Sequence, residues 1–279
     1  MRTLFLAWAC LLLTIPCSAD IIYVKEGGTG SGSSWADAYG DLQDGLNDAV
    51  SGDEIWVASG TYYPTYGYGL WIGSRGKHFR MKNGVAIYGG FDGTETSLAE
   101  RNVQNNETIL SGDIGVPDDP DDNCYHVFYH PSGTNLDATA ILDGFTVTAG
   151  NAGDSSEPHN DGGGMYNDYS SPTVTGCSFV DNSADLGGGM FNNYSDPTVT
   201  GCTFTGNLAG NGGGMYNDTS SPEVINCIFS SNSAGDGHDG GGIGNYRSST
   251  IVTNCTFLTN EASRAGGALN SDHDSNCTV

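Results

Sequence analysis

The sequence predicts an all-β fold: a right-handed, single-stranded parallel β-helix with three strands and about 25 residues per coil and a short N-terminal capping helix. The first observation is a glycine-rich motif, because GGGMYN at 162–167 returns as GGGMFN at 187–192, as GGGMYN at 212–217, and diluted at 240–245 and 266–270. Cys-x-Phe is a second marker in the same phase, and an asparagine three residues after each phenylalanine is a third. Fixed periods of this length indicate stacked repeats.

Each repeat contains three short extended pieces, which in the first regular unit are 164–167, 172–175 and 177–180. Turn-forming residues separate them. Alternation points one set of side chains inward, and stacking places equivalent side chains about 4.8 Å apart. The expected columns are Met165, Met190 and Met215; Cys177, Cys202, Cys227 and Cys255; Phe179, Phe204, Phe229 and Phe257; and the turn asparagines Asn182, Asn207, Asn232 and Asn260. A Ca²⁺-binding nonapeptide β-roll is rejected, because it requires a different period and motif.

Residues 1–19 have the character of a secretory signal peptide. Arg2 supplies a positive charge, residues 4–15 an apolar run, and 17–19 a small-residue cleavage site. The apolar run is too short to span a membrane. After it we expect an N-terminal strand and capping helix over 20–60, irregular coils with loops over 61–150, and regular repeats over 151–279 that are truncated at the C-terminus.

An amphipathic helix is predicted over 35–50, with Ser34 as its N-cap. Its apolar face comprises Trp35, Tyr39, Leu42, Leu46 and Val50. A helix at this place covers the open end of a solenoid core. In the irregular part, strands are expected at 85–88, 108–110, 126–129, 140–142 and 145–147. Leu142, Phe145 and Val147 should occupy the column positions of Val174, Cys177 and Phe179.

The chain is strongly acidic, with 33 Asp and Glu against 9 Lys and Arg and a formal net charge of −24. This balance disfavours nucleic acid and anionic membranes as partners, because little is available to neutralise phosphates. Six cysteines follow the signal peptide. An even count in an exported protein suggests disulfides, but a cysteine at a repeated inward position fills a small apolar slot. We favour buried thiols over bridges between neighbouring coils.

Two stretches raise the question of a metal ion. The acidic segment 117–122 could hold Ca²⁺, but a solvated loop is the preferred interpretation. His159 with Asp161 and His238 with Asp239 lie on extra-long loops at the same corner of the coil, three coils and about 14 Å apart. We expect surface insertions there rather than one shared metal site. No metal site and no cofactor are therefore assigned.

A row of aromatic residues is the best candidate for binding. If the methionines face inward, then Tyr166, Phe191 and Tyr216 face outward, one on each coil, and they are flanked by Asp168, Asn193 and Asp218. Such a row could stack against sugar rings and hydrogen-bond to them. The alternative is that the aromatic side chains stack only on one another and stabilise the parallel strands.

The combination of Gly-Gly-x-Leu at 266–269 with Phe-x-x-Asn at 179–182, 204–207, 229–232 and 257–260 resembles polymorphic outer-membrane-protein-type β-helices. The segments 34–39, 51–57, 88–91, 93–97, 109–113 and 142–146 are similar to the openings of exported bacterial β-helix-repeat proteins. The resemblance covers nearly all of the chain after residue 19. It implies a bacterial surface or secreted protein of adhesin character within the pectin-lyase-like superfamily.

That superfamily also includes polysaccharide lyases and hydrolases. A lyase acting on polyuronates needs cations, yet residues 151–279 contain no lysine, and the segment 237–240 departs from the Gly-His-Gly pattern of polygalacturonases. No catalytic residue is assigned. We expect an exported, non-catalytic, adhesin-like protein, secreted or at the cell surface or outer membrane, monomeric, and offering its stacked face to an extracellular glycan or a host or cell-surface protein. The alternative is a carbohydrate-active enzyme, either a polysaccharide lyase or a glycoside hydrolase.

Overall fold

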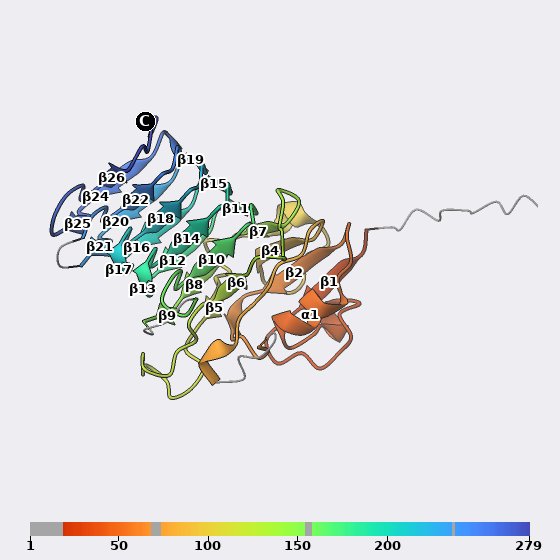
Figure 1. Cartoon of the computed structure of the whole chain (residues 1–279). Helices are drawn as coiled ribbons and strands as arrows, with labels where there is room; N and C mark the ends of the chain where they lie inside the picture. The colour runs from red at the N-terminus through yellow and green to blue at the C-terminus, as the bar shows by residue number, and fades with distance from the viewer. Residues whose placement is uncertain (1–18, 68–73, 154–157, 236–237) are drawn as a thin grey trace, which may run out of the picture.

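The computed structural model describes residues 19–67, 74–153, 158–235 and 238–279. The chain winds into stacked coils that form four parallel sheets, here called sheets A to D (Figure 1). The chain ends in the last of these coils, at the opposite end of the stack from β1 and α1. The predicted signal peptide lies almost entirely outside the described residues.

The strands of each sheet follow one another along the stack. Sheet A contains β1 (Ile21–Val24), β2 (Glu54–Ala58), β4 (Ala86–Phe91), β7 (Ile141–Asp143), β11 (Thr173–Thr175), β15 (Thr198–Thr200), β19 (Glu223–Ile225) and β23 (Ile251–Thr253). Sheet B contains β3 (Gly60–Tyr62), β5 (Thr108–Ser111), β8 (Thr146–Thr148), β12 (Ser178–Val180), β16 (Thr203–Thr205), β20 (Ile228–Ser230) and β24 (Thr256–Leu258). Sheet C contains β6 (Phe128–His130), β10 (Met165–Asp168), β14 (Met190–Asn193), β18 (Met215–Asp218), β22 (Ile243–Tyr246) and β26 (Leu269–Asp272). Sheet D contains β9 (Asn151–Ala152), β13 (Ser183–Leu186), β17 (Leu208–Asn211), β21 (Ser233–Ala234) and β25 (Glu261–Ala262).

The predicted parallel β-helix is confirmed, because equivalent residues of consecutive repeats pair in register. Met165 pairs with Met190, and Met190 with Met215. Besides the three strands expected in a coil, a short fourth one, in sheet D, follows the Asp181–Asn182 corner. The strands of sheet D have only two to four residues. Such a segment is too short for an alternation of apolar and polar residues to indicate a strand.

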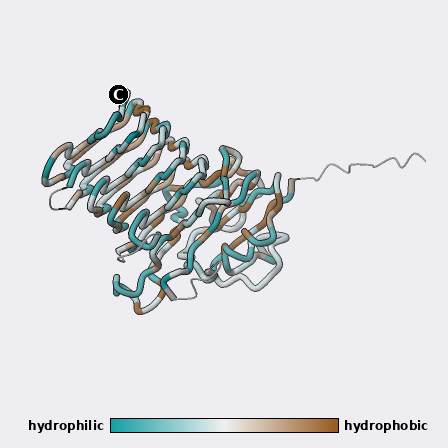
Figure 2. The backbone as a smooth tube through the Cα atoms, in the orientation of Figure 1, coloured by the Kyte–Doolittle hydropathy of each residue, from teal (hydrophilic) through white to brown (hydrophobic). Residues whose placement is uncertain are grey.

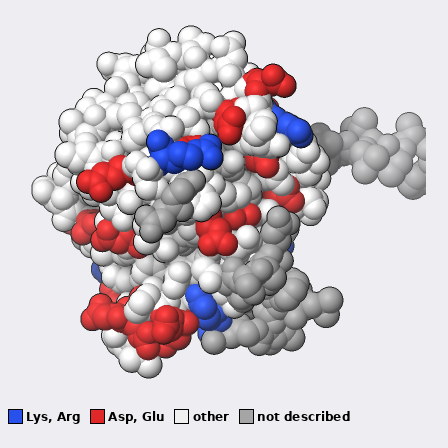
Figure 3. Space-filling view, turned by 60° about the vertical axis from the view of Figure 1, so that its left-hand side comes forward, with Lys and Arg blue, Asp and Glu red and all other residues white. Residues whose placement is uncertain are grey.

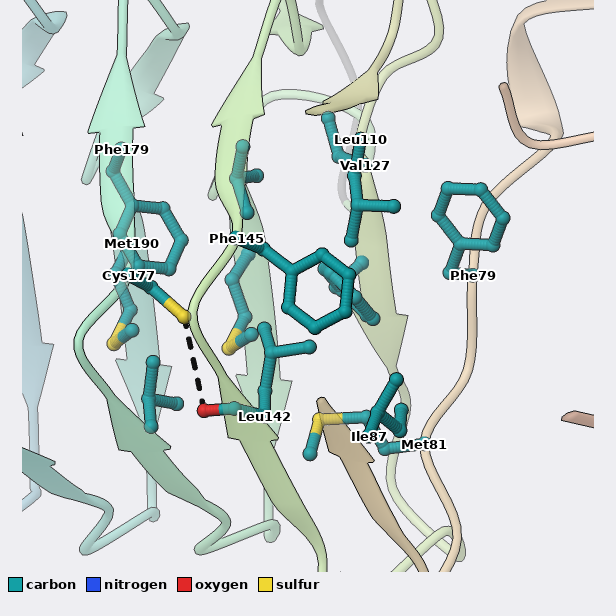
Figure 4. Close-up of a cluster of buried hydrophobic side chains, with 14 of the residues drawn as sticks. Phe79, Met81, Ile87, Leu110, Val127, Leu142, Phe145, Cys177, Phe179 and Met190 are labelled. Atoms are coloured by element: carbon teal, nitrogen blue, oxygen red, sulfur yellow. Dashed lines mark hydrogen bonds between the residues drawn. The ribbon is translucent and has the colours of Figure 1, made fainter. Parts of the chain in front are cut away.

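Equivalent side chains form columns inside the coil. The rings of Phe179, Phe204, Phe229 and Phe257 stack with centroids 4.8, 4.7 and 5.1 Å apart. The backbone N–H of Cys177 donates to Sγ of Cys202 at 3.4 Å, and Cys202 makes the same contact with Cys227. Figure 4 shows Cys177, Phe179 and Met190 in the same buried cluster as Leu142 and Phe145. Along the stacked strands, brown apolar positions are interspersed with teal polar ones (Figure 2).

Buried asparagines bond along the stack at the corner that leads into sheet D. Nδ2 of Asn182 donates to Oδ1 of Asn207 at 3.1 Å, and Asn207 donates likewise to Asn232 at 2.9 Å. Each Oδ1 also accepts a backbone N–H from the preceding coil, as between Asn207 and Asn182. These bonds satisfy polar groups at a corner where the strand ladder is interrupted.

A second asparagine column was not predicted as a ladder. It runs inside sheet C through Asn167, Asn192, Asn217 and Asn245, with Nδ2-to-Oδ1 distances of 2.9 Å at each step. A serine column follows it, where the backbone N–H of Ser170 donates to Oγ of Ser195 and that of Ser195 to Ser220, both at 2.9 Å. The sheet C corner is therefore lined by polar groups that satisfy one another.

The N-terminal cap differs from the prediction in length. A 3₁₀ turn (η1, Trp35–Asp37) and a short helix (α1, Leu42–Asp48) replace the continuous helix expected over 35–50. Asp41, not Ser34, caps α1, and its carboxylate accepts the N–H of Gln43 at 2.8 Å. Leu42 and Leu46 are fully buried against the first coil, whereas Val50 is 54% exposed. The capping position is as expected, but Gly40 and Asp41 interrupt the predicted helix.

The irregular coils join the regular ones in the expected register. Leu142 pairs with Val174, and Val147 pairs with Phe179. Two further 3₁₀ turns, η2 (Ser74–Gly76) and η3 (Leu98–Glu100), lie in the longer connections.

The six cysteines from Cys124 to Cys277 are free thiols. Among the described residues, no helix is long and apolar enough to cross a membrane.

Candidate functional site

The outer face of sheet C carries the residues that the sequence singled out for binding. Tyr166, Phe191 and Tyr216 are paired neighbours on β10, β14 and β18, and their ring centroids are 5.2 and 6.0 Å apart. Asp168, Asn193 and Asp218 form the adjacent row two residues further along the same strands. The methionines beside them are fully buried inside the coil, so the two rows lie on the outside.

The expectation of an open aromatic platform is wrong for two of the three rings. Tyr166 is 8% exposed and Phe191 is 4% exposed. The rings cover one another, and the column continues to Tyr129, whose centroid lies 5.2 Å from that of Tyr166. The glycine-rich turn also packs closely here, because a Cβ on Gly187 would lie 3.0 Å from Cα of Phe191. Strand alternation predicts which face a side chain occupies, but not what covers that face.

The flanking polar row is partly occupied by bonds within the protein. Nδ2 of Asn193 donates to Oδ1 of Asp168 at 3.0 Å, and the other oxygen of Asp168 accepts the backbone N–H of Ser132. Oδ1 of Asp218 accepts from the hydroxyl of Thr219 at 2.8 Å. The bonds of Asp168 therefore brace neighbouring coils, whereas the bond of Asp218 to Thr219 stays within one coil.

The aromatic column ends at β22, where Gly244 pairs with Tyr216 in the place of a ring. The missing side chain leaves a cavity of about 280 Å³ on the outer face of sheet C, which we call the Gly244 pocket. Tyr216 closes one end, and a Cβ on Gly244 would lie 2.8 Å from its Cδ2. The other lining residues are Asn211, His238, Asp239, Asn245, Tyr246, Arg264, Asn270, Asp272 and His273.

An ion pair between two coils forms one wall of the Gly244 pocket. Both carboxylate oxygens of Asp239 accept from Arg264, at 3.1 Å from Nε and 2.5 Å from Nη2. The Asp239 side chain is 7% exposed, whereas that of Arg264 is 62% exposed. The guanidinium is therefore anchored at its inner edge and open to solvent elsewhere, a geometry suited to binding an oxygen-rich ligand.

Aromatic and titratable side chains form the opposite wall. The imidazole of His273 meets the ring of Tyr246 edge-on, with centroids 4.9 Å apart, and Arg247 lies over the same ring at 5.0 Å. Burial, followed by the charge of Asp218, raises the pKa of Tyr216 to about 12. The Tyr216 phenol therefore stays protonated at neutral pH.

The two histidine-containing loops lie apart, as the repeat register requires. Asp161 pairs with Leu186, and Asp239 with Ala265. His159 stacks on Tyr125 with centroids 4.3 Å apart, away from the Gly244 pocket residues. In the acidic segment, Oδ2 of Asp122 accepts the backbone N–H of Val116 at 2.7 Å. Within the ranges that the structure describes, no group of three or more His, Cys, Asp or Glu side chains could hold a metal ion.

Most of the Gly244 pocket residues were missed at the level of sequence, including Tyr246, Arg264, Asp272 and His273. The available signal was the break in the repeat, where GGGMYN becomes GGGIGN at 240–245. A repeat that loses one bulky outward side chain leaves a gap between otherwise regular neighbours.

Charge is spread unevenly over the molecule. In the view of Figure 3, which brings the C-terminal coils forward, acidic side chains outnumber basic ones and much of the surface is uncharged. Arg264 belongs to a chain with 9 Lys and Arg in all. The local cation is thus a distinguishing feature of the Gly244 pocket.

Comparison with known proteins bears on the fold. The family described as right handed beta helix region matches residues 123–279. The crystal structure of pectate lyase Pel9A is similar, with a TM-score of 0.48 and 16% identity, over 85% of this chain and 53% of that chain. The chain thus spans about half the length of that protein. No match to a curated protein was found. With more than half of its residues matched and a parallel coil observed throughout the regular repeats, the chain belongs to the right-handed β-helix family.

Proposed function

We propose that the protein is an exported, non-catalytic β-helix surface protein, of adhesin-like character, that binds extracellular glycans at the Gly244 pocket. The observation that carries this proposal is the gap in the aromatic column beside Tyr216, walled by Tyr246 and the exposed guanidinium of Arg264. Sugar rings present apolar C–H faces and polar hydroxyls, so aromatic side chains next to hydrogen-bonding groups suit them.

Binding is favoured over turnover by the state of the carboxylates. Glycoside hydrolysis needs one carboxyl group as acid and another as base or nucleophile. Asp239 is engaged by Arg264 through both oxygens. Oδ1 of Asp272 accepts the backbone N–H of His273 at 2.8 Å. Asp239 is thus committed to a wall of the pocket, and Asp272 is the other carboxylate among the described lining residues. The pair of carboxyl groups that hydrolysis needs is therefore not available among them, which supports a binding role.

Export is supported by the signal-peptide character of residues 1–19 and by the resemblance to bacterial surface proteins. The strongly acidic composition supports a partner other than nucleic acid. We infer a monomer, secreted or held at the cell surface or outer membrane.

A glycan array with matched tyrosine variants tests the proposal. Tyr246→Ala removes an aromatic wall of the pocket, whereas Tyr194→Ala removes a half-exposed tyrosine that does not line it. We expect array binding by the wild-type protein and by Tyr194→Ala, and loss of binding in Tyr246→Ala.

Turnover assays on the array hits separate the alternative function. The proposal predicts neither new reducing ends nor unsaturated products. Product formation that Asp239→Asn or Asp272→Asn abolishes would instead assign a carbohydrate-active enzyme.

A further inference from the structure

A second cavity, of about 480 Å³, lies at the corner between sheets A and B. Its lining comes from the four consecutive coils that contain β5, β8, β12 and β16, and it includes none of the Gly244 pocket residues. The floor contains Gly144, Gly176 and Gly201, at the same corner of the last three of these coils. We call this cavity the corner groove.

The backbone alone does not explain these glycines. All three have positive φ, between 57° and 83°, which glycine tolerates well. The next two coils place Asn226 and Asn254 at the same corner with φ of 55° and 52°. Asparagine therefore fits this turn, and it adds a bond, because Nδ2 of Asn254 donates to Oδ1 of Asn226 at 2.6 Å. Three coils lack this side chain, and the space stays open above Gly176 and Gly201.

Two of the three glycines have open space above them. A Cβ on Gly201 would meet nothing within 4 Å, and one on Gly176 would meet only the Asp143 carboxylate at 3.7 Å. Val103 covers Gly144, where a Cβ would lie 2.9 Å from its Cγ2. The groove is bounded along the stack, because its lining extends from Gly144 to Gly201 but not to Asn226.

A fixed wall rises at the N-terminal end of the groove. Val103, Gln104 and Glu107 form it, and the loop that carries them is tied down by the ion pair of Arg101 with Asp143 at 2.8 Å. Both side chains of this pair are less than one fifth exposed. The wall is therefore built before any ligand arrives, as in most small-molecule sites.

The lining chemistry indicates the class of ligand. Thr146, Ser178 and Thr203 each contribute a hydroxyl group, one per coil, and Glu107 accepts from Thr146 at 3.0 Å. Among the described residues that line the groove, Glu107 is the one charged residue, and none is Lys or Arg. Hydroxyl groups that repeat every 4.8 Å or so suit a ligand that itself repeats hydroxyl groups along a line. A polyuronate would meet a carboxylate without a compensating cation.

We propose that the corner groove binds an extended segment of a neutral, linear polysaccharide, with about one sugar residue on each coil. Backbone carbonyls, the hydroxyl groups and Glu107 bind the sugar hydroxyls, and the glycine floor admits the rings. This site is independent of the Gly244 pocket, and neither requires the other.

Titration calorimetry with cellohexaose, mannohexaose and xylohexaose tests the proposal, with hexagalacturonate as the acidic probe. The double variant Gly176→Asn/Gly201→Asn fills the groove with the residue that the neighbouring coils already carry at this turn. We expect the wild-type protein to bind at least one neutral hexaose, and this variant to bind it at least about tenfold more weakly with an unchanged melting temperature. Asn226→Gly lengthens the floor by one coil and should bind as tightly as the wild type or more tightly.

Three results would overturn the assignment. They are the absence of binding of every neutral hexaose, tighter binding of hexagalacturonate, or equal binding by the groove-filled double variant and the wild type. Tyr246→Ala serves as the reference for the other site. If Tyr246→Ala abolishes glycan binding while the groove-filled variant does not, the Gly244 pocket is supported as the glycan site and the corner groove is rejected. The reverse pattern supports the corner groove and rejects the Gly244 pocket.

Discussion

Nδ1 of His130 lies 2.8 Å from Oδ1 of Asn167, at the head of the buried asparagine column of sheet C. The other ring nitrogen, Nε2, accepts the backbone N–H of Met81 at 3.3 Å. Nε2 must therefore be unprotonated, and Nδ1 carries the hydrogen that it donates to Asn167. Because Asn167 accepts at Oδ1, its amide group donates onward to Asn192. One neutral imidazole thus sets the direction of every bond in the column.

Acid should destabilise the protein through its buried histidines. Burial lowers the pKa of His130 and of His126 to about 4, and burial followed by the charge of Arg80 lowers that of His78 to about 3. In the unfolded chain these groups take up protons below their usual pKa of about 6.5. Stability should therefore be greatest above about pH 6.5 and fall toward pH 4, by up to ~1.4 kcal/mol per pH unit for each histidine.

Urea unfolding between pH 8 and pH 5 measures this slope, and His130→Gln serves as the matched variant. Glutamine keeps a donor for Asn167 but does not titrate, so the variant should lose part of the slope. A free energy of unfolding that stays flat over this range would count against neutral buried histidines.

Asn192→Ala should cost far more than Asn193→Ala, although the residues are adjacent. Asn192 is fully buried, and its loss leaves the amide group of Asn167 and Oδ1 of Asn217 without their partners. Each buried group left unpaired costs ~1–3 kcal/mol. We expect a loss of about 2–4 kcal/mol for Asn192→Ala, against less than ~1 kcal/mol for Asn193→Ala on the outer face. Chemical denaturation measures both, and equal losses would refute the ladder's role.

The phenylalanine stack predicts a gradient of stability along the coil. Phe204 is fully buried between two parallel rings, so Phe204→Ala should lose ~3–5 kcal/mol. Phe257, nearer the C-terminal end, is only partly buried and stacks on Phe229. Phe257→Ala should be clearly milder. Thermal unfolding of the two variants would contradict the stack if Phe257→Ala proved the more severe.

Thiol reactivity should follow position in the cysteine column. The inner thiols are shielded from solvent, because Cys124, Cys177, Cys202 and Cys227 are at most 1% exposed. Burial raises the pKa of Cys202 and also that of the partly buried Cys255 and Cys277, so accessibility decides which thiols react. Cys255 and Cys277 are only partly buried. A thiol-specific reagent should therefore label Cys255 and Cys277 in the native protein, and the inner cysteines only after unfolding. Failure of the unfolded, unreduced protein to expose all six thiols would instead indicate disulfides.

The repeat markers predicted the interior well because stacking converts a sequence period directly into a column. The phase of Phe179 and Asn182 was enough to place their equivalents. Asn167 recurred just as regularly, but alternation treats an inward polar residue as an exception, so its ladder was not foreseen. The alternation of side chains along a strand placed Tyr166 on the outer face. It could not indicate that Tyr166 is buried there, because the rings that cover it belong to neighbouring coils. Gly40 and Asp41 ended a helix pattern that the spacing of apolar residues had extended across them.

The Gly244 pocket exists because one coil departs from the repeat, so restoring the repeat is the most direct test of its role. Gly244→Tyr places an aromatic side chain where β10, β14 and β18 carry one. Because a Cβ at this position would lie 2.8 Å from Cδ2 of Tyr216, the Tyr216 ring must turn aside, and the two rings together should fill the pocket. Titration calorimetry with the best glycan from the array compares this variant with the wild type. We expect loss of binding at the pocket in a variant whose circular dichroism spectrum is still that of the folded β-helix. Undiminished glycan affinity in the filled variant would contradict this role for the pocket.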